Sequence, residues 1–195
     1  TKTNNRIELK RHNGKDCFDS DDMLMKAIRK RVKYGDNMSD AGMRKTLSWT
    51  AGTHRVSNFR PTIAKYIYDN YSGNGNVLDF SSGYGGRMLG AMTSNKVKKY
   101  TGIEPNDDTY YGLVGMDQLV SNFNNSLHND TLEDVDLGDE KFDLSFSSPP
   151  YFNTEEYSYD DKQSFVRYKT KEEWRDNFLT VLIKRNYDWI TDDGY

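Results

Sequence analysis

The sequence is poor in cysteine and histidine, and it has no long apolar run. Its single cysteine, Cys17, excludes an internal disulfide and is typical of a reducing compartment, so a cytoplasmic location is expected. The three histidines lack the spacing of metal ligands, and we therefore expect no metal site. With 29% charged residues and a mean hydropathy of −0.92, the sequence contains no segment of membrane-spanning length and apolarity. These absences favour a polar globular protein that uses neither a membrane nor a metal.

Basic residues are scarce in most of the chain and concentrated at its start. Residues 1–60 contain 14 Lys and Arg against 7 Asp and Glu, whereas the remainder contains 13 against 23. A basic segment on an acidic body is compatible with contact to nucleic-acid phosphates, and equally typical of a solvated helix face beside an irregular arm. We expect a basic, partly helical segment over residues 1–57 and the main domain over residues 58–195.

The main domain alternates between short apolar strands and amphipathic helices. Strands are predicted near residues 77–79, 99–103, 126–128 and 142–146. This alternation is typical of an α/β fold whose mostly parallel sheet binds ligands at the carboxyl ends of its strands. A last helix is predicted after Thr170, with Glu173 completing a capping box. Because a turn toward another strand follows this helix, C-terminal strands are expected to be missing from the sequence.

The stretch 76–92, NVLDFSSGYGGRMLGAM, predicts a strand, a tight turn and a helix start. The strand closes with Asp79, and Gly83 and Gly85 follow in the turn. Glycine lets a ligand approach the backbone, and a helix start offers free N–H groups. Met88 occupies the third glycine position of the dinucleotide fingerprint, and no Lys-Ser/Thr pair of a P-loop is present. The acid therefore favours a ligand with ammonium or hydroxyl donors over a pyrophosphate.

Two further polar features follow later strands. Glu104 ends the second strand, where an acid in a doubly wound sheet meets ribose hydroxyls, and Ser-Pro-Pro-Tyr ends the fourth strand. Taken singly, the glycine turn fits an ordinary strand–helix connection, Glu104 a solvated strand end, and Ser-Pro-Pro-Tyr a rigid loop or a proline-rich ligand for another protein. Their order at successive strand ends indicates a shared site.

Together these motifs resemble those of the amino-group DNA methyltransferases, over residues 58–195. The resemblance implies a Rossmann-like class I methyltransferase fold with S-adenosyl-L-methionine as cofactor. The family's first motif corresponds to D-F-S-S-G-Y-G, where Ser81 replaces the usual aromatic residue, and its second motif corresponds to G-I-E. By resemblance, cofactor contacts are assigned to Phe59, Pro61, Asp79, Ser81, Gly83, Gly85, Glu104 and Asp130.

Ser148-Pro149-Pro150-Tyr151 is similar to the family's catalytic motif, which implies methyl transfer to an exocyclic amine of a DNA base turned out of the duplex. Such an amine is a poor nucleophile because its lone pair is delocalised into the ring. Ser148 Oγ and the Pro149 carbonyl would accept its N–H bonds, and the paired prolines would fix the backbone. Tyr151 would stack on the base. Serine at the first position favours cytosine N4 over adenine N6.

Alternatives to this hypothesis are methylation of RNA or of a protein glutamine, whose enzymes use similar motifs on the same sheet. A non-catalytic module that binds S-adenosylmethionine or nucleic acid is a further alternative. DNA is the expected partner.

Overall fold

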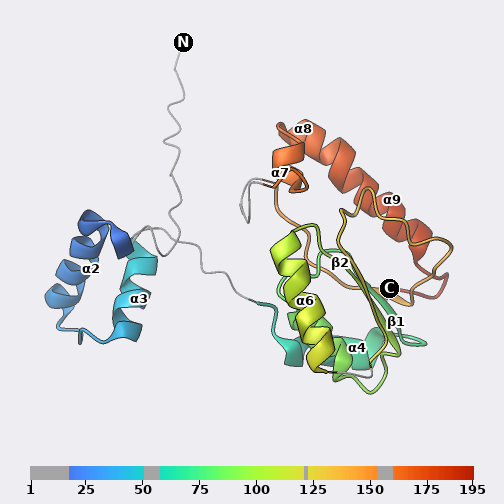
Figure 1. Cartoon of the computed structure of the whole chain (residues 1–195), viewed down its shortest axis with the longest axis horizontal. Helices are drawn as coiled ribbons and strands as arrows, with labels where there is room; N and C mark the ends of the chain where they lie inside the picture. The colour runs from blue at the N-terminus through green and yellow to red at the C-terminus, as the bar shows by residue number, and fades with distance from the viewer. Residues whose placement is uncertain (1–17, 51–57, 121–122, 153–159) are drawn as a thin grey trace, which may run out of the picture. The chain divides into compact units, whose positions relative to one another are not determined.

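The computed structural model describes residues 18–50, 58–120, 123–152 and 160–195 (Figure 1). The chain divides into two compact units, residues 1–57 and 58–195, and each is considered by itself. Residues 1–17, which include Cys17, lie outside the described residues. Among the helices of the described part, none has both the length and the apolarity needed to cross a lipid bilayer.

The first unit contains a helical hairpin of α2 (Asp21–Tyr34) and α3 (Asp40–Thr50). Helix α2 ends at Gly35, whose φ of 66° lies in the left-handed region that glycine adopts without a Cβ penalty. The sequence predicts only a partly helical segment over residues 1–57, without a distinct helix where α3 forms. Helix α3 instead buries Thr46 and Leu47, and this burial stabilises a helix that its polar composition does not reveal.

A buried cation connects the two helices. Arg31 is only 7% exposed, and its guanidinium donates hydrogen bonds to the backbone carbonyls of Asn37 and Gly42 and to the Thr46 hydroxyl. Within the described residues 18–50, no carboxylate forms an ion pair with Arg31. The packing of α2 against α3 therefore relies on hydrogen bonds from the Arg31 guanidinium to neutral oxygen acceptors.

The Arg31→Met variant is expected to destabilise the hairpin by about 3 kcal/mol, because bonds from a charged donor contribute roughly 1.5–3 kcal/mol each and the carbonyls would lose their partner. Amide hydrogen exchange over α2 and α3 measures this loss. Lys33→Met, in the exposed last turn of α2, is the matched control. Equal protection in both variants would contradict the role given to Arg31.

The second unit is built on a four-stranded parallel sheet with the order β3-β2-β1-β4. Its strands are β1 (Asn76–Asp79), β2 (Lys99–Ile103), β3 (Asn125–His128) and β4 (Leu144–Ser145). The predicted α/β class with a parallel sheet is confirmed, and the order is the Rossmann-like one of doubly wound folds. The fourth strand is shorter than the predicted 142–146, because Phe142 forms only an isolated parallel bridge to Ile190.

Helices cover both faces of the sheet (Figure 1). They are α4 (Pro61–Tyr71), α5 (Gly86–Met92), α6 (Asp107–Leu119), α7 (Ser164–Arg167), α8 (Lys171–Trp174), the π-helical η1 (Arg175–Leu179) and α9 (Thr180–Trp189). Successive strand residues point to opposite faces, so Val77 lies in the core under α4, α5 and α6, and Leu78 lies in the core under η1 and α9. The predicted capping box of Thr170 and Glu173 is present. Helix α7 lies between the Ser-Pro-Pro-Tyr motif and Thr170, where the sequence pattern predicts no helix.

Strand β1 lies between β2 and β4, so the chain leaves β1 toward one side of the sheet and returns on its other side. In open parallel sheets this reversal opens a crevice outside the carboxyl ends of the two strands, where ligands bind. The carboxyl end of β1 carries Asp79, and the segment after β4 carries the Ser-Pro-Pro-Tyr motif. The topology thus brings two separately predicted motifs to one position.

Candidate functional site

The Asp79 carboxylate forms the centre of this edge and is fully buried. Its Oδ2 accepts hydrogen bonds from Arg87 Nε and from the Tyr100 hydroxyl, both at 2.8 Å. Its Oδ1 accepts a hydrogen bond from the Ser147 hydroxyl at 2.6 Å. Because these partners come from α5, β2 and the segment after β4, Asp79 organises the site by joining three parts of the unit.

Opposite charges balance within this cluster. Burial alone would lower the pKa of Arg87, yet the adjacent Asp79 carboxylate raises it, so Arg87 stays a cation. The pKa of Tyr100 is raised well above 10.0, first by burial and then by Asp79, so its phenol stays neutral and donates a hydrogen bond to Asp79. Arg87 also donates to the Ser81 carbonyl. The guanidinium therefore fixes the turn to the carboxylate.

The glycine-rich turn requires glycine for two separate reasons. Gly83 and Gly85 have φ of 56° and 78°, which side chains rarely adopt. Gly86 has no room for a side chain, because a Cβ there would lie 2.0 Å from the Phe59 carbonyl oxygen. Its N–H donates to Asn58 Oδ1 at 3.0 Å. The segment before α4 thus clamps the start of α5.

Most N–H groups of the turn are already bonded within the chain. The Ser81 N–H donates to the Ser147 hydroxyl, and the Ser82 N–H donates to the Ile103 carbonyl. The Gly83 N–H donates to the Glu104 carboxylate, and the Gly86 N–H donates to Asn58 Oδ1. The outer side of Gly83 is open, since a Cβ there would meet nothing nearer than the Ser81 carbonyl oxygen at 4.0 Å. The outer side of the turn therefore combines an open glycine surface with a nearby carboxylate.

That carboxylate belongs to Glu104, which follows β2 and is 8% exposed. Its Oε2 accepts the Gly83 N–H at 2.9 Å, and its Oε1 accepts the Asn106 N–H at 3.0 Å. Burial raises the pKa of Glu104 above 4.5, although the two backbone hydrogen bonds oppose this shift. Each oxygen retains acceptor capacity, so the ionised group can hold ligand hydroxyls.

The segment after β4 is fixed at both ends of the predicted catalytic motif. Before the motif, Ser147 accepts the Ser81 N–H at 2.9 Å while it donates to Asp79. After the motif, Phe152 has a φ of 46°, which is uncommon for a residue other than glycine, and its ring centroid lies 6.0 Å from that of Trp174. These two anchors bracket Ser148-Pro149-Pro150-Tyr151. Ser148 is exposed, and Tyr151 is 60% exposed.

The remaining predicted residues occupy two places. The centroid of the Phe59 ring lies 5.4 Å from that of the Phe146 ring, and the two rings are nearly perpendicular. The Arg87 guanidinium lies 5.6 Å from the centroid of the Phe59 ring. Pro61 is the first residue of α4. Asp130 follows β3, and its Oδ1 accepts the Thr131 N–H at 2.8 Å. The structure therefore gathers Phe59, Asp79, Ser81, Gly83, Gly85 and Glu104 around the adjacent ends of β1 and β2, and it places Asp130 after β3, which is separated from β1 by β2.

Sequence reasoning missed the residues that connect the motifs, namely Asn58, Arg87, Tyr100 and Ser147. Ser147 and Asn58 adjoin recognised motifs, so their position was a usable signal. Tyr100 lies in the next strand, 21 residues from Asp79, and no local pattern connects the two. Their pairing follows from strand register, which places Tyr100 beside Val77.

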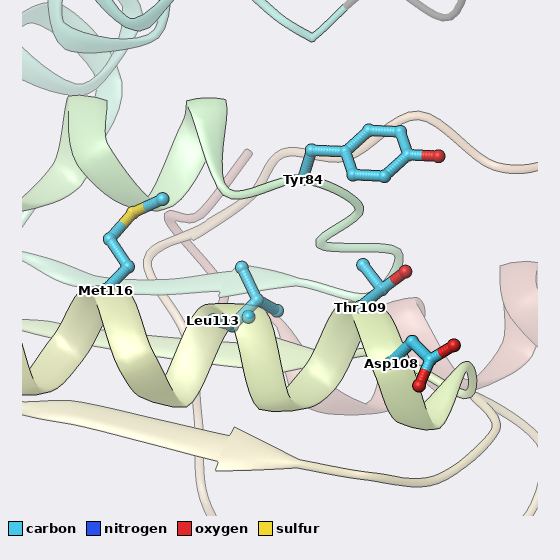
Figure 2. A pocket seen from close by; sticks show the side chains of 6 residues that line it. Tyr84, Asp108, Thr109, Leu113 and Met116 are labelled. Carbon is cyan, nitrogen blue, oxygen red and sulfur yellow. The ribbon is translucent and has the colours of Figure 1, made fainter.

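A pocket of about 270 Å³ lies on the α6 side of the turn (Figure 2). Tyr84 contributes from the turn, while Met116 and Asp108 lie toward opposite ends of the α6 wall (Figure 2). Its lining is completed by Thr109, Gly112 and Leu113. Asp79 and Glu104 are not among the lining residues, whereas Tyr84 lies between Gly83 and Gly85 of the glycine-rich turn. Among the described residues, no group of three or more His, Cys, Asp and Glu is placed to hold a metal ion.

No protein-family model matches the chain, and no curated protein matches it. Among solved structures, the plantazolicin methyltransferase BpumL, in complex with SAH, has 10% identity, a TM-score of 0.45, and covers 92% of this chain and 53% of its own. Coclaurine N-methyltransferase, bound to N-methylheliamine and SAH, has 11% identity, a TM-score of 0.45, and coverages of 91% and 56%. DesVI of Streptomyces venezuelae has 17% identity, a TM-score of 0.44, and coverages of 69% and 47%. The chain thus spans about half the length of these proteins, and the function proposed below rests on its own residues.

Proposed function

We propose that residues 58–195 bind S-adenosyl-L-methionine and transfer its methyl group to an exocyclic amino group of a DNA base, with cytosine N4 favoured over adenine N6. The observation that carries this proposal is the 2.6 Å hydrogen bond between Ser147 and Asp79. This bond joins the glycine-rich turn directly to the Ser-Pro-Pro-Tyr loop at the switch point of the sheet. A cofactor held at the turn would therefore lie beside the proposed catalytic motif.

The residues at the turn fit this cofactor. The open side of Gly83 gives the ligand a close approach to the backbone, and the Glu104 carboxylate keeps acceptor capacity for ribose hydroxyls. Phe59 would flank the methionine end, and Asp130, which follows β3, would contact the adenine. Asp79 would act through the turn, because its carboxylate oxygens already bond Arg87, Tyr100 and Ser147.

In this proposal the chain's own residues mainly align the target amine with the methyl group of the cofactor. S-adenosylmethionine supplies an electrophilic methyl group. Ser148 Oγ and the Pro149 carbonyl would accept the N–H bonds of the target amine and direct its lone pair, while Pro150 limits backbone movement. Tyr151 is 60% exposed and is available to stack on a base turned out of the duplex. Ser147 and Phe152 would hold this loop in place from its two ends.

A labelled-methyl assay tests the substrate. The full chain is incubated with methyl-labelled cofactor and, in parallel, with duplex DNA, single-stranded DNA, transfer RNA and a glutamine-containing protein, and the products are digested to nucleosides or amino acids. Label in N4-methylcytosine is the expected result. Label confined to RNA or glutamine would replace the DNA substrate, and the absence of label from every acceptor would overturn the proposed catalysis.

Cofactor affinity is expected to fall in acid. Glu104 is the proposed acceptor of the ribose hydroxyls, and its pKa lies above 4.5 in the folded chain, so it protonates at a higher pH than an exposed glutamate does. The raised pKa of Glu104 also makes the folded chain relatively more stable in acid, whereas it weakens cofactor binding there. The folded state keeps a proton that the unfolded chain has lost, so this contribution is present below about pH 4.5 and is lost as the pH rises through the folded pKa. Titration of S-adenosylhomocysteine between about pH 4.5 and 8 should show the loss of affinity in acid. Glu104→Gln should bind more weakly and with a flatter pH profile, whereas an unchanged profile would exclude Glu104 as the titrating ligand.

A further inference from the structure

Trp49, near the end of α3, is an exposed aromatic residue in a basic setting. Its side chain is 60% exposed. The ammonium groups of Lys45 and Lys30 lie 4.9 Å and 5.7 Å from its ring centroid, one from each helix of the hairpin. Both distances are within cation–π range. An indole, which is largely apolar, is thus held on the surface with two positive charges beside it.

The packing of the hairpin does not account for this arrangement. The residues that it buries are Ala27, Arg31, Thr46 and Leu47. Exposure of an indole to water is unfavourable, and an aromatic ring beside basic side chains is the combination with which proteins bind single-stranded nucleic acids. The partner must then offer both a flat apolar face and negative charge.

The two lysines beside Trp49 form no ion pair within the described residues 18–50. Lys26 forms an ion pair with Asp22, whereas no carboxylate within the described residues 18–50 forms one with Arg29, Lys30, Lys33, Arg44 or Lys45. The acids Asp21, Asp22 and Asp40 lie in the first turns of their helices, where they complement the helix dipoles. The free positive charge therefore belongs to the same side chains that surround the indole and to their neighbours.

We infer that the α2–α3 hairpin binds an unpaired stretch of nucleic acid, with a base stacked on Trp49 and the adjoining phosphates near Lys30 and Lys45. A flat base supplies the apolar face and its phosphates supply the charge, which together meet both requirements. A base within a duplex has its faces covered by its neighbours, so a single strand or a locally opened duplex is the form that this surface fits. The proposed site lies on α2 and α3, and it does not depend on the methyl transfer proposed for residues 58–195.

The test measures binding of a fluorescently labelled deoxythymidine oligomer of about 12 nucleotides to the full chain by anisotropy, a length within the range that a single-strand site covers. Trp49→Leu should weaken binding about tenfold, which is the effect of losing one stacked base, and Trp49→Phe should weaken it less. Lys30→Gln and Lys45→Gln should each lower the slope of log affinity against log salt by roughly 0.7. Tyr187→Leu, 85% exposed on α9, and Lys184→Gln on the same helix are matched controls expected to change nothing.

Circular dichroism of each variant shows whether the hairpin is folded. Equal affinity of Trp49→Leu and the parent would overturn the inference, as would tighter binding of a duplex of the same length than of the single strand. Binding of a polyanion without bases, such as heparin, with the same dependence on Trp49 would also overturn it. S-adenosylhomocysteine titration of Trp49→Leu separates the two proposals, because cofactor binding should be unchanged whether or not the oligomer binds.

Discussion

Replacement of Asp79 by alanine is expected to lower the free energy of unfolding of the 58–195 unit by about 3–5 kcal/mol, and to abolish cofactor binding. The carboxylate is fully buried and neutralises Arg87, which is itself only 5% exposed. Without Asp79, a guanidinium remains buried without an opposite charge, and Tyr100 and Ser147 lose their acceptor. Urea unfolding of the parent and the variant measures the first effect, and calorimetric titration with S-adenosylhomocysteine measures the second.

The double variant Asp79→Ala, Arg87→Met separates charge balance from site geometry. Removal of both charges should restore part of the lost stability, because replacement of a buried ion pair by apolar groups is often nearly neutral. Cofactor binding should stay weak, since Ser81 and Ser147 would still lack the groups that position them. A double variant that binds S-adenosylhomocysteine as the parent does would show that Asp79 serves stability alone.

The second large effect is expected at Ser148. Ser148→Ala should lower methyl transfer by about 10²–10³-fold, the typical loss when one polar group that acts in the transition state is removed. Cofactor affinity should be unchanged, because the exposed Ser148 takes no part in the network around Asp79. Single-turnover assays with saturating cofactor measure the rate. A variant that transfers methyl groups as fast as the parent would exclude Ser148 as the acceptor of the amine N–H.

Alanine substitution of the adjacent Ser147 gives a useful comparison with Ser148→Ala. In the parent chain the Ser147 hydroxyl donates to Asp79 and accepts the Ser81 N–H, so the loss of this hydroxyl should weaken cofactor binding as well as slow methyl transfer. Ser147→Thr keeps the hydroxyl and should recover much of both. This contrast between adjacent serines distinguishes a group that contacts the substrate from one that positions the loop.

The local elements of the second unit could be predicted because their signals are local. The strand near residues 77–79 follows from the apolar pair Val77-Leu78 before the glycine-rich turn, the helix after Thr170 follows from a capping box, and both form as expected. Strand β4 was overpredicted because the alternation of residues 142–146 is a local pattern, whereas pairing depends on which neighbour is available. Helix α3 was missed for the opposite reason, since its stability comes from burial against α2.

The site shows the same division between local and distant information. Motif order indicated that Asp79, Glu104 and Ser148 follow successive strand ends, and parallel pairing explains why those ends lie together. The sequence could not show that internal partners already occupy Asp79, because these partners come from positions 8, 21 and 68 residues away. The inward-facing role of Asp79 therefore became visible only with strand register and side-chain positions.

The most direct test of the central claim is calorimetric titration of the full chain with S-adenosylhomocysteine near neutral pH. The proposed site predicts saturable one-to-one binding that Glu104→Gln weakens and Lys184→Gln leaves unchanged. Absence of heat and of saturation, in a chain that circular dichroism shows to be folded, would contradict the cofactor site and the methyl transfer proposed from it.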